Sequence, residues 1–143
     1  MSLNQAVSQV MQIDIHTVDV SAPISEVRSL MRTHGLHHLP VLENDELVGV
    51  VSFSDLLGLG FGRDVGASTP FVEAIDQWHP LREVMEPAMV TIGAKATLAE
   101  AAERLSTGSY HSLPVVNGRG QLVGILTSTD LVKTLHRLLT KAS

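Results

Sequence analysis

The chain contains one pattern twice, as HHLPVLENDELVGVVSFSDL at residues 37–56 and as HSLPVVNGRGQLVGILTSTDL at residues 111–131. The Leu-Pro-Val triplet shifts by 74 residues, from Leu39 to Leu113, and the second copy then carries one extra residue in its polar turn. An internal repeat of this length is the signature of a duplicated supersecondary unit. We therefore predict that the chain is built from two copies of one motif.

Each copy has the hydrophobic pattern of a helix, two strands and a second helix. Apolar side chains at helical spacing predict amphipathic helices over 24–31 and 98–105. Short β-branched runs on both sides of the polar turn predict a hairpin of buried strands. The predicted strands are 39–42 and 47–51 in the first copy and 113–116 and 122–126 in the second. Ser54-Asp55 and Thr129-Asp130 then resemble helix starts.

With a first strand before each first helix, this order predicts an α/β (α+β) fold of two β-α-β-β-α repeats, at residues 4–57 and 78–139. A repeat of roughly 50 to 60 residues buries too little surface to fold well alone. We therefore expect the two repeats to pack sheet to sheet about a pseudo-twofold axis. A short helical segment, Val7–Met11 or Leu81–Met85, is expected to lead into each first strand; we call these the leading segments.

Residues 58–77 separate the repeats and are predicted to be a linker, mobile over its glycine-rich part. Its alternate glycines resemble a dinucleotide-binding loop, but such a loop follows a strand and opens a helix, whereas this one follows a predicted helix and runs into Pro70. Residues 71–78 have apolar side chains at helical spacing. They predict a short helix in which Trp78 packs in the core.

Composition excludes several classes of function. Among the 143 residues, 10 Lys and Arg against 15 Asp and Glu give a net charge of −5, and aromatic residues make up 3%. The chain thus lacks the basic field and the stacking rings of a nucleic-acid-binding protein. No apolar run approaches the ~20 residues that cross a bilayer, and no signal-peptide pattern is present, which predicts a cytoplasmic protein without membrane insertion. The absence of Cys excludes disulfides and thiolate chemistry.

The residues that carry chemistry are Gly49-x-x-Ser52-x-x-Asp55 and Gly124-x-x-Thr127-x-x-Asp130. Each motif spans a predicted strand-to-helix corner, where the first N–H groups of the helix are free to bind a polar ligand. A hydroxyl suits a phosphate, and a carboxylate that accepts two hydrogen bonds suits the diol of a ribose. The alternative is that Ser54 or Thr129, or the Asp beside it, merely caps the helix. Recurrence of the spacing favours a ligand corner in at least one copy.

These motifs, together with Val10-Met11, Val84-Met85 and the Leu-Pro-Val strands, resemble a tandem pair of CBS domains, often called a Bateman module, over nearly the whole chain. The resemblance implies two clefts between the repeats that bind adenosine derivatives such as AMP, ADP, ATP or S-adenosylmethionine, in a regulatory protein that is often a homodimer. It also implies that the final Asp of each motif holds ribose, that the preceding Ser or Thr approaches phosphate, and that residues around the first strand and the Pro-Val strand surround adenine. The ligand-binding residues implied in this way are Thr17, Val18, His38, Leu39, Pro40, Ser52, Asp55, Thr91, Ile92, Ser112, Leu113, Pro114, Thr127 and Asp130.

One position departs from several adenylate-binding relatives, in which a basic residue precedes Leu-Pro-Val and grips phosphate. Here His38 and Ser112 occupy that position. AMP, a nucleoside or S-adenosylmethionine is therefore expected in preference to ATP unless Arg63, Arg119 or Lys133 reaches the site. If His38 meets a phosphate, binding strengthens as the pH falls toward the ordinary histidine pKa of about 6.5.

The histidines at 34, 37 and 38 raise a metal site as an alternative. His34 and His37 share a helix face only if the helix continues through Gly35, and glycine there favours a helix end. No carboxylate pattern or Cys completes a zinc set, so we predict no metal site and no required cofactor. No nucleophile has an adjacent base and an orienting partner, and we predict that the chain is not an enzyme.

The closing helix carries an apolar stripe at Leu131, Leu135 and Leu138, flanked by Val132 and Leu139. Together with a charged fraction of only 17%, against roughly 25% on average, this stripe predicts a homodimer. A ligand sensor and a purely structural homodimerisation module without a ligand both fit these features. In many relatives such a pair regulates a fused enzyme, channel or transporter. The chain is therefore either free-standing, acting on a separate regulated protein, or a segment of a longer one.

Overall fold

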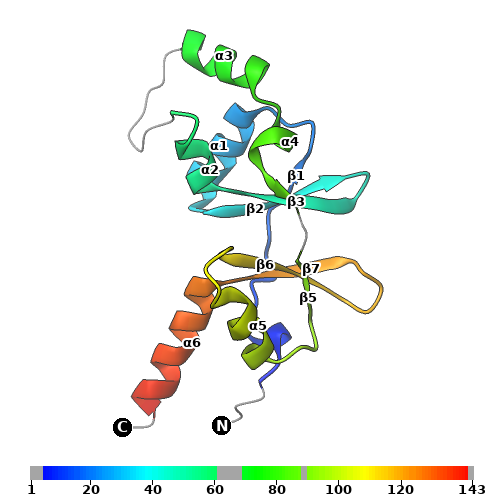
Figure 1. Cartoon of the computed structure of the whole chain (residues 1–143), viewed down its shortest axis with the longest axis vertical. Coiled ribbons are helices and arrows are strands. Elements are labelled where there is room, and N and C mark those ends of the chain that lie inside the picture. Colours follow the sequence, from blue (N-terminus) through cyan, green and yellow to red (C-terminus); the bar gives the residue numbers. More distant parts are fainter. Residues whose placement is uncertain (1–4, 61–68, 88–89, 142–143) are drawn as a thin grey trace. The chain divides into compact units, whose positions relative to one another are not determined.

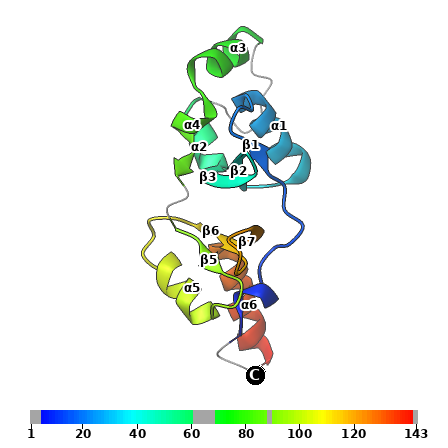
Figure 2. The ribbon, with the colours of Figure 1, turned by 90° about the vertical axis from the view of Figure 1, so that its right-hand side faces the viewer.

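The structure, a computed structural model, describes residues 5–60, 69–87 and 90–141. The chain divides into two compact units: unit 1 consists of Met1–Ile15 and Val90–Ser143, and unit 2 consists of His16–Met89. Each unit holds one β-sheet with helices on one of its faces (Figures 1 and 2). The predicted α+β fold with two repeats is confirmed.

Unit 2 contains the sheet of the first repeat. Its elements in chain order are β1 (Val18–Asp19), α1 (Ile24–His34), β2 (His38–Glu43), β3 (Glu46–Ser52), α2 (Phe53–Leu57), α3 (Thr69–Trp78), α4 (Leu81–Val84) and β4 (Glu86–Pro87). The strand order is β1-β2-β3-β4, in which β1 runs parallel to β2 and the other neighbours are antiparallel.

Unit 1 contains the sheet of the second repeat. Its elements are a 3-10 helix η1 (Val7–Gln9), β5 (Ile92–Gly93), α5 (Leu98–Leu105), β6 (Ser112–Val116), β7 (Leu122–Thr127) and α6 (Ser128–Lys141). The strand order is β5-β6-β7, with β5 parallel to β6 and β6 antiparallel to β7. Gln12 extends this sheet through an antiparallel bridge to Ile125 of β7. The predicted order strand, helix, strand, strand, helix is confirmed in both units.

The leading segments form η1 and α4, and each packs in the unit that holds the sheet of the other repeat. The Val7 N–H donates to Ala96 O at 2.8 Å, and the Gln12 N–H donates to Ile125 O at 2.9 Å. Val7 is buried in the core of unit 1, while Leu81 and Met85 are buried in the core of unit 2. The predicted repeats at 4–57 and 78–139 follow chain order, whereas the compact units exchange the segments that precede the first strands.

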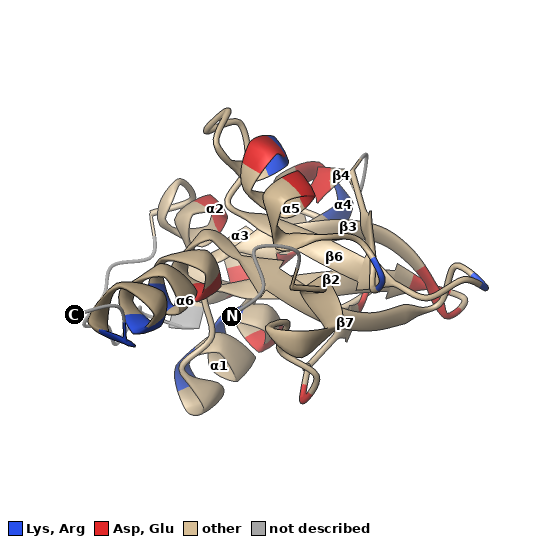
Figure 3. Ribbon diagram, turned by 90° about the horizontal axis from the view of Figure 1, so that it is seen from below, with Lys and Arg blue, Asp and Glu red and all other residues tan. Residues whose placement is uncertain are grey.

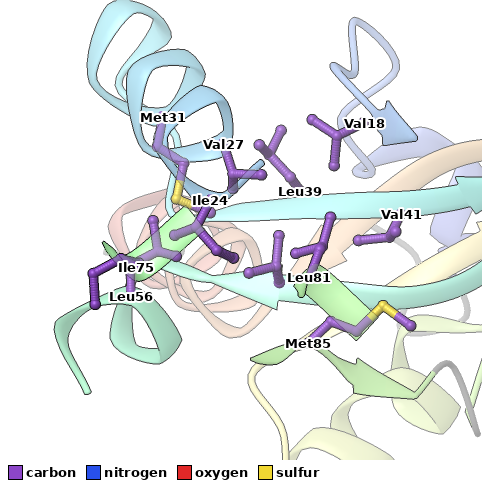
Figure 4. Packing of buried hydrophobic residues seen from close by; sticks show 11 residues of the cluster. Val18, Ile24, Val27, Met31, Leu39, Val41, Leu56, Ile75, Leu81 and Met85 are labelled. Atoms are coloured by element: carbon purple, nitrogen blue, oxygen red, sulfur yellow. The ribbon is translucent and has the colours of Figure 1, made fainter. Parts of the chain in front are cut away.

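The core of unit 2 lies between α1 and one face of its sheet (Figure 4). Ile24, Val27 and Met31 project from one side of α1, as the helical spacing predicts, and are buried. The other buried members of this cluster are Val18, Leu39, Val41, Val51, Leu56, Ile75, Leu81 and Met85. The core of unit 1 is a second cluster of buried apolar side chains, formed by Val7, Ile92, Ala101, Leu105, Leu113, Val115 and Leu126.

The prediction that Trp78 packs in the core is wrong, because its side chain is 69% exposed. Helix α3 buries Ile75 instead, and the Asp76 carboxylate accepts hydrogen bonds from Ser25 N at 2.8 Å and from Ser25 Oγ at 2.6 Å. These contacts hold α3 against the first turn of α1 and leave Trp78, at the end of α3, in solvent. The predicted linker falls partly on residues 61–68, which lie outside the described residues.

Candidate functional site

A reciprocal pair of hydrogen bonds closes the strand-to-helix corner of unit 2, which we call the Asp55 corner. Ser52 ends β3 and is the N-cap of α2: its Oγ accepts from Asp55 N at 3.1 Å, and its own N–H donates to Asp55 Oδ2 at 2.8 Å. This is the capping-box arrangement, which satisfies two N–H groups that a helix start leaves free. The predicted helix start at Ser54 is wrong, since Ser52 makes the cap.

The Asp130 corner of unit 1 repeats this geometry. Thr127 Oγ1 accepts from Asp130 N at 3.1 Å, and Thr127 N donates to Asp130 Oδ2 at 2.9 Å. Helix α6 begins at Ser128, so the predicted start at Thr129 is also late. The Asp130 carboxylate has a further partner that the sequence analysis missed, the amide nitrogen of Gln12.

The strand register brings the predicted residues of each corner together. In unit 2, His38 on β2 is the cross-strand partner of Ser52 on β3. In unit 1, Ser112 on β6 is the partner of Thr127 on β7. The main chain of His37, the residue before His38, also belongs to the Asp55 corner. Its carbonyl oxygen accepts a hydrogen bond from the N–H of Phe53, the first residue of α2, at 2.8 Å. His111 O likewise accepts from Ser128 N at 2.9 Å, so the recurring histidine carbonyl is part of each corner.

Four predicted ligand residues have side chains inside the hydrophobic cores. Val18 and Leu39 belong to the core cluster of unit 2, and Ile92 and Leu113 belong to that of unit 1. Side chains buried in this way have no surface left for a ligand. Any contact that a ligand makes with these residues therefore comes through their main chains.

Thr17 and Thr91 lie one residue before β1 and β5. Neither threonine belongs to the core cluster that holds the next residue, Val18 or Ile92. The parallel pairing of Val18 with Val41 and of Ile92 with Val115 places each threonine level with Pro40 or Pro114. Thr17, Pro40, His38, Ser52 and Asp55 therefore gather at one end of the unit 2 sheet.

Protein atoms occupy the space beside the glycine of each motif, where a side chain would lie. A Cβ at Gly49 would lie 2.6 Å from Met85 Sδ and 2.7 Å from Glu86 O, and a Cβ at Gly124 would lie 2.6 Å from Met11 Sδ and 2.8 Å from Gln12 O. Each glycine thus leaves room for the methionine that ends a leading segment and for the main chain of the next residue. This packing explains why the Val-Met pairs and the glycines recur together in the sequence.

The three cations considered for phosphate binding have different places in the fold. Arg63 lies outside the described residues, and Arg119 lies in the hairpin turn at the opposite end of β7 from Thr127. Lys133 is exposed on α6, three residues after Asp130, and this spacing makes the two side chains neighbours on the helix surface. Basic residues recur along α6, which Figure 3 shows as blue segments of that helix.

A further carboxylate, Asp19, ends β1 beside Val18. Its Oδ2 accepts hydrogen bonds from Ser21 Oγ at 2.5 Å and from Ser21 N at 2.9 Å. Because both bonds favour the charged form, with the hydroxyl bond the larger cause, the pKa of Asp19 is lowered. The sequence signal for this contact is the Asp-x-Ser spacing of Asp19 and Ser21, which is typical of such turns.

The histidines predicted not to form a metal site are separated by the end of α1. Gly35 has φ +64° and ends the helix, as expected, so His34 and His37 do not share a helical face. The His34 ring stacks on that of His16, with centroids 4.0 Å apart. Within residues 5–60, 69–87 and 90–141, no group of three or more His, Asp or Glu side chains is placed to hold a metal ion.

No helix in this part of the chain is long and apolar enough to span a membrane.

Comparison with known proteins places this geometry in a family. The family model described as CBS domain matches residues 7–61 and again residues 81–137. Inosine-5'-monophosphate dehydrogenase of Thermoplasma acidophilum is 29% identical over 119 residues, which are 83% of this chain and 21% of the dehydrogenase. The chloroplastic CBS domain-containing protein CBSX1 of Arabidopsis thaliana is 31% identical over 140 residues, which cover 84% of this chain and 58% of that protein.

Among solved structures, CBSX2 in complex with AMP is 27% identical and superposes with a TM-score of 0.74, over 93% of this chain and 97% of the CBSX2 chain. The chain spans about a fifth of the length of the dehydrogenase and little more than half of the length of CBSX1, so both relatives extend well beyond the matched region. Two family matches that together cover most of the chain, on two repeats with the same corner, show that the chain belongs to the CBS domain family.

Proposed function

We propose that this protein is a regulatory module that binds an adenosine-containing metabolite at the Asp55 corner, the Asp130 corner or both, and that it performs no catalysis of its own. The observation that carries this proposal is the state of the Asp55 carboxylate. Its Oδ2 accepts from Ser52 N, and among the described residues nothing donates to its Oδ1. A carboxylate has acceptor sites for about four hydrogen bonds, so Asp55 retains capacity for both hydroxyls of a ribose.

Two observations favour an adenosine derivative with little phosphate. CBSX2, at 27% identity, is bound to AMP in its crystal structure, which supports a ligand of this class here. The corners themselves offer His38 or Ser112 where a phosphate would need a fixed cation. AMP, adenosine and S-adenosylmethionine are therefore favoured over ADP and ATP.

Regulation follows if the ligand stabilises one arrangement of the protein over another. We propose that the arrangement of the repeats or of a homodimer changes on binding and is read by a separate protein. Helix α6 is the proposed dimer surface, since Val132, Leu135 and Leu139 are 63%, 54% and 62% exposed on it. Large apolar side chains of this exposure on one helix mark an interaction site more often than a free surface. The expected cytoplasmic location remains a prediction.

The test has to separate ligand binding from helix capping, because Ser52 and Asp55 also hold the corner together. Asp55→Asn keeps one side-chain oxygen for the Ser52 N–H but loses the second acceptor and the charge. We expect this variant to lose at least tenfold in affinity for adenosine at its corner, since a hydrogen bond to a charged group contributes about 1.5–3 kcal/mol. Ser52→Ala is the control for stability, with a loss of about 1 kcal/mol from the missing cap.

The measurement is a thermal-shift series with AMP, ADP, ATP, S-adenosylmethionine, adenosine and guanosine monophosphate, followed by calorimetric titration of the best ligand. A ligand at one hundred times its Kd raises the apparent stability by about 2.7 kcal/mol. A shift with an adenosine compound and none with the guanine compound supports the proposal. If no compound shifts the transition, the second candidate function stands, a structural homodimerisation module without a ligand. In that case helix capping alone accounts for Ser52 with Asp55 and for Thr127 with Asp130.

A further inference from the structure

The two corners differ at the residue that directly follows each leading segment. The 74-residue shift that relates the repeats carries Gln12 onto Glu86. The fold places both residues alike: Gln12 bridges Ile125 at the edge of the unit 1 sheet, and Glu86 pairs with Val50 at the edge of the unit 2 sheet. Ile125 and Val50 are themselves equivalent residues of the repeat. The same backbone position therefore carries an amide in one unit and a carboxylate in the other.

The Gln12 amide binds the aspartate of its corner. Its Nε2 donates to Asp130 Oδ1 at 3.1 Å and to Asp130 Oδ2 at 3.2 Å. The nitrogen has to face the carboxylate, because the amide oxygen is an acceptor and would be repelled. With Thr127 N at 2.9 Å from Oδ2, both oxygens of Asp130 already accept hydrogen bonds. These are the two atoms that a ribose diol would use.

Glu86 cannot do the same for Asp55. A carboxylate has no proton to donate at neutral pH, and two carboxylates repel each other. Consistently, the Glu86 side chain is exposed and makes no hydrogen bond to any described residue, and Asp55 Oδ1 receives none. Among the described residues, no protein group therefore has to be displaced before a diol binds Asp55.

We infer that Gln12 acts as an internal substitute for the ligand hydroxyls at Asp130, so that a ribose binds first at the Asp55 corner. This inference rests on the proposed function and deepens it. It ranks the two corners by their affinity for ribose and attributes the difference to the residue at position 12 or 86. A ribose at Asp130 has to displace the Gln12 amide, and the work of that displacement weakens binding by about tenfold, the worth of one hydrogen bond to a charged group.

Exchange of the two residues tests the inference, with adenosine as the probe because it carries the diol and no charge. Each corner is isolated by inactivating the other: Asp55→Asn leaves the Asp130 corner, and Asp130→Asn leaves the Asp55 corner. In the Asp55→Asn protein, Gln12→Glu is expected to tighten adenosine binding by about tenfold, because the competing donor is gone. In the Asp130→Asn protein, Glu86→Gln is expected to weaken binding by a similar factor, because a donor now faces Asp55.

The matched control is Gln9→Ala in the Asp55→Asn protein. Gln9 lies on the leading segment that precedes Gln12, and its side chain accepts a hydrogen bond from Ala6 N. Calorimetric titration gives the affinities, and the side-chain NH2 signals of Gln12 in a 15N correlation spectrum give an independent readout. These signals should move when adenosine is added to the Asp55→Asn protein, as the amide leaves the carboxylate.

The outcomes separate the inference from the function on which it rests. Opposite changes for Gln12→Glu and Glu86→Gln support the inference, because a general loss of structure would weaken both. Adenosine binding that neither exchange alters, or that Gln12→Glu weakens, overturns the inference and leaves the proposed function in place. If neither the wild-type protein nor any variant binds adenosine, AMP or S-adenosylmethionine, both are wrong.

Discussion

Gly49 on β3, which recurs as Gly124 on β7, gives the most direct test of the packing. We predict that Gly49→Ala destabilises the protein, because a Cβ there would lie 2.6 Å from Met85 Sδ and 2.7 Å from Glu86 O. Carbon contacts are normally about 3.5–4.0 Å, so the overlap is close to 1 Å. The methionine side chain can turn away, but Glu86 O belongs to β4, which pairs with β3 at Gly49 and Val50.

The expected magnitude follows from three contributions. Overpacking of a filled site costs about 1–3 kcal/mol. Disturbance of the β3–β4 pairing adds about 1 kcal/mol for each hydrogen bond lost. The lower backbone entropy of alanine in the unfolded chain returns about 0.4–1 kcal/mol. The net expectation is a loss of about 1–3 kcal/mol in the free energy of unfolding.

Urea unfolding followed by far-ultraviolet circular dichroism measures this loss as a fall in the transition midpoint. Gly93→Ala is the matched control: Gly93 is also a strand glycine, but no atom lies within 4 Å of the Cβ position. It should change stability by no more than about 0.5 kcal/mol, as surface substitutions usually do. Equal stability of Gly49→Ala and Gly93→Ala would refute the argument that the glycine exists to admit the leading segment.

Three further predictions concern other parts of the molecule. Leu135→Asp on α6 should convert a homodimer to a monomer in light scattering, because it places a charge in the exposed apolar stripe, and an unchanged mass would exclude α6 as the dimer surface. Ser21→Ala should raise the pKa of Asp19 toward its ordinary value of about 3.9, measured by NMR titration, since the Ser21 hydroxyl bond is the larger cause of the lowered pKa. A lowered folded-state pKa stabilises the fold above the unfolded pKa and this effect is lost as the pH falls through the folded pKa, so Ser21→Ala should also weaken the acid dependence of stability; an unmoved pKa would contradict the assignment. Asp76→Ala should free α3 from α1 and increase proteolytic cleavage near residue 70, because both hydrogen bonds to Ser25 are lost, whereas an unchanged digestion pattern would show that Ile75 alone holds the helix.

Much of the fold could be predicted because its elements are defined by local patterns. The apolar spacing in α1 and α5 follows the helical period, and the hairpin strands show β-branched runs around a polar turn. Gly35 ends α1 in the left-handed conformation that glycine adopts most readily, as its position predicted. The boundaries of the second helices were less accurate, because Ser52 and Ser54 are equally good caps by residue type.

The exposure of Trp78 shows where such patterns fail. The spacing of apolar residues in 71–78 correctly predicts a helix, but which of them is buried depends on how α3 meets α1. That contact is set by Asp76 and Ser25, which are 51 residues apart in the chain. A hydrogen bond between distant residues has no local period, so a sequence pattern does not report it.

The sequence by itself determined the duplicated motif, the order of its elements, the family and the residue types at each corner, because all of these depend on periodicity, spacing and identity along the chain. Only the tertiary structure decided that each leading segment packs in the core of the other repeat and that the side chains of Val18 and Leu39 are buried. It also decided that Gln12 binds Asp130, whereas no described residue donates a hydrogen bond to Asp55 Oδ1. Gln12 and Asp130 are 118 residues apart, and their contact exists only because the chain folds back to pair Gln12 with Ile125. The two corners therefore differ because long-range pairing brings Gln12 to one corner and Glu86 to the equivalent place in the other.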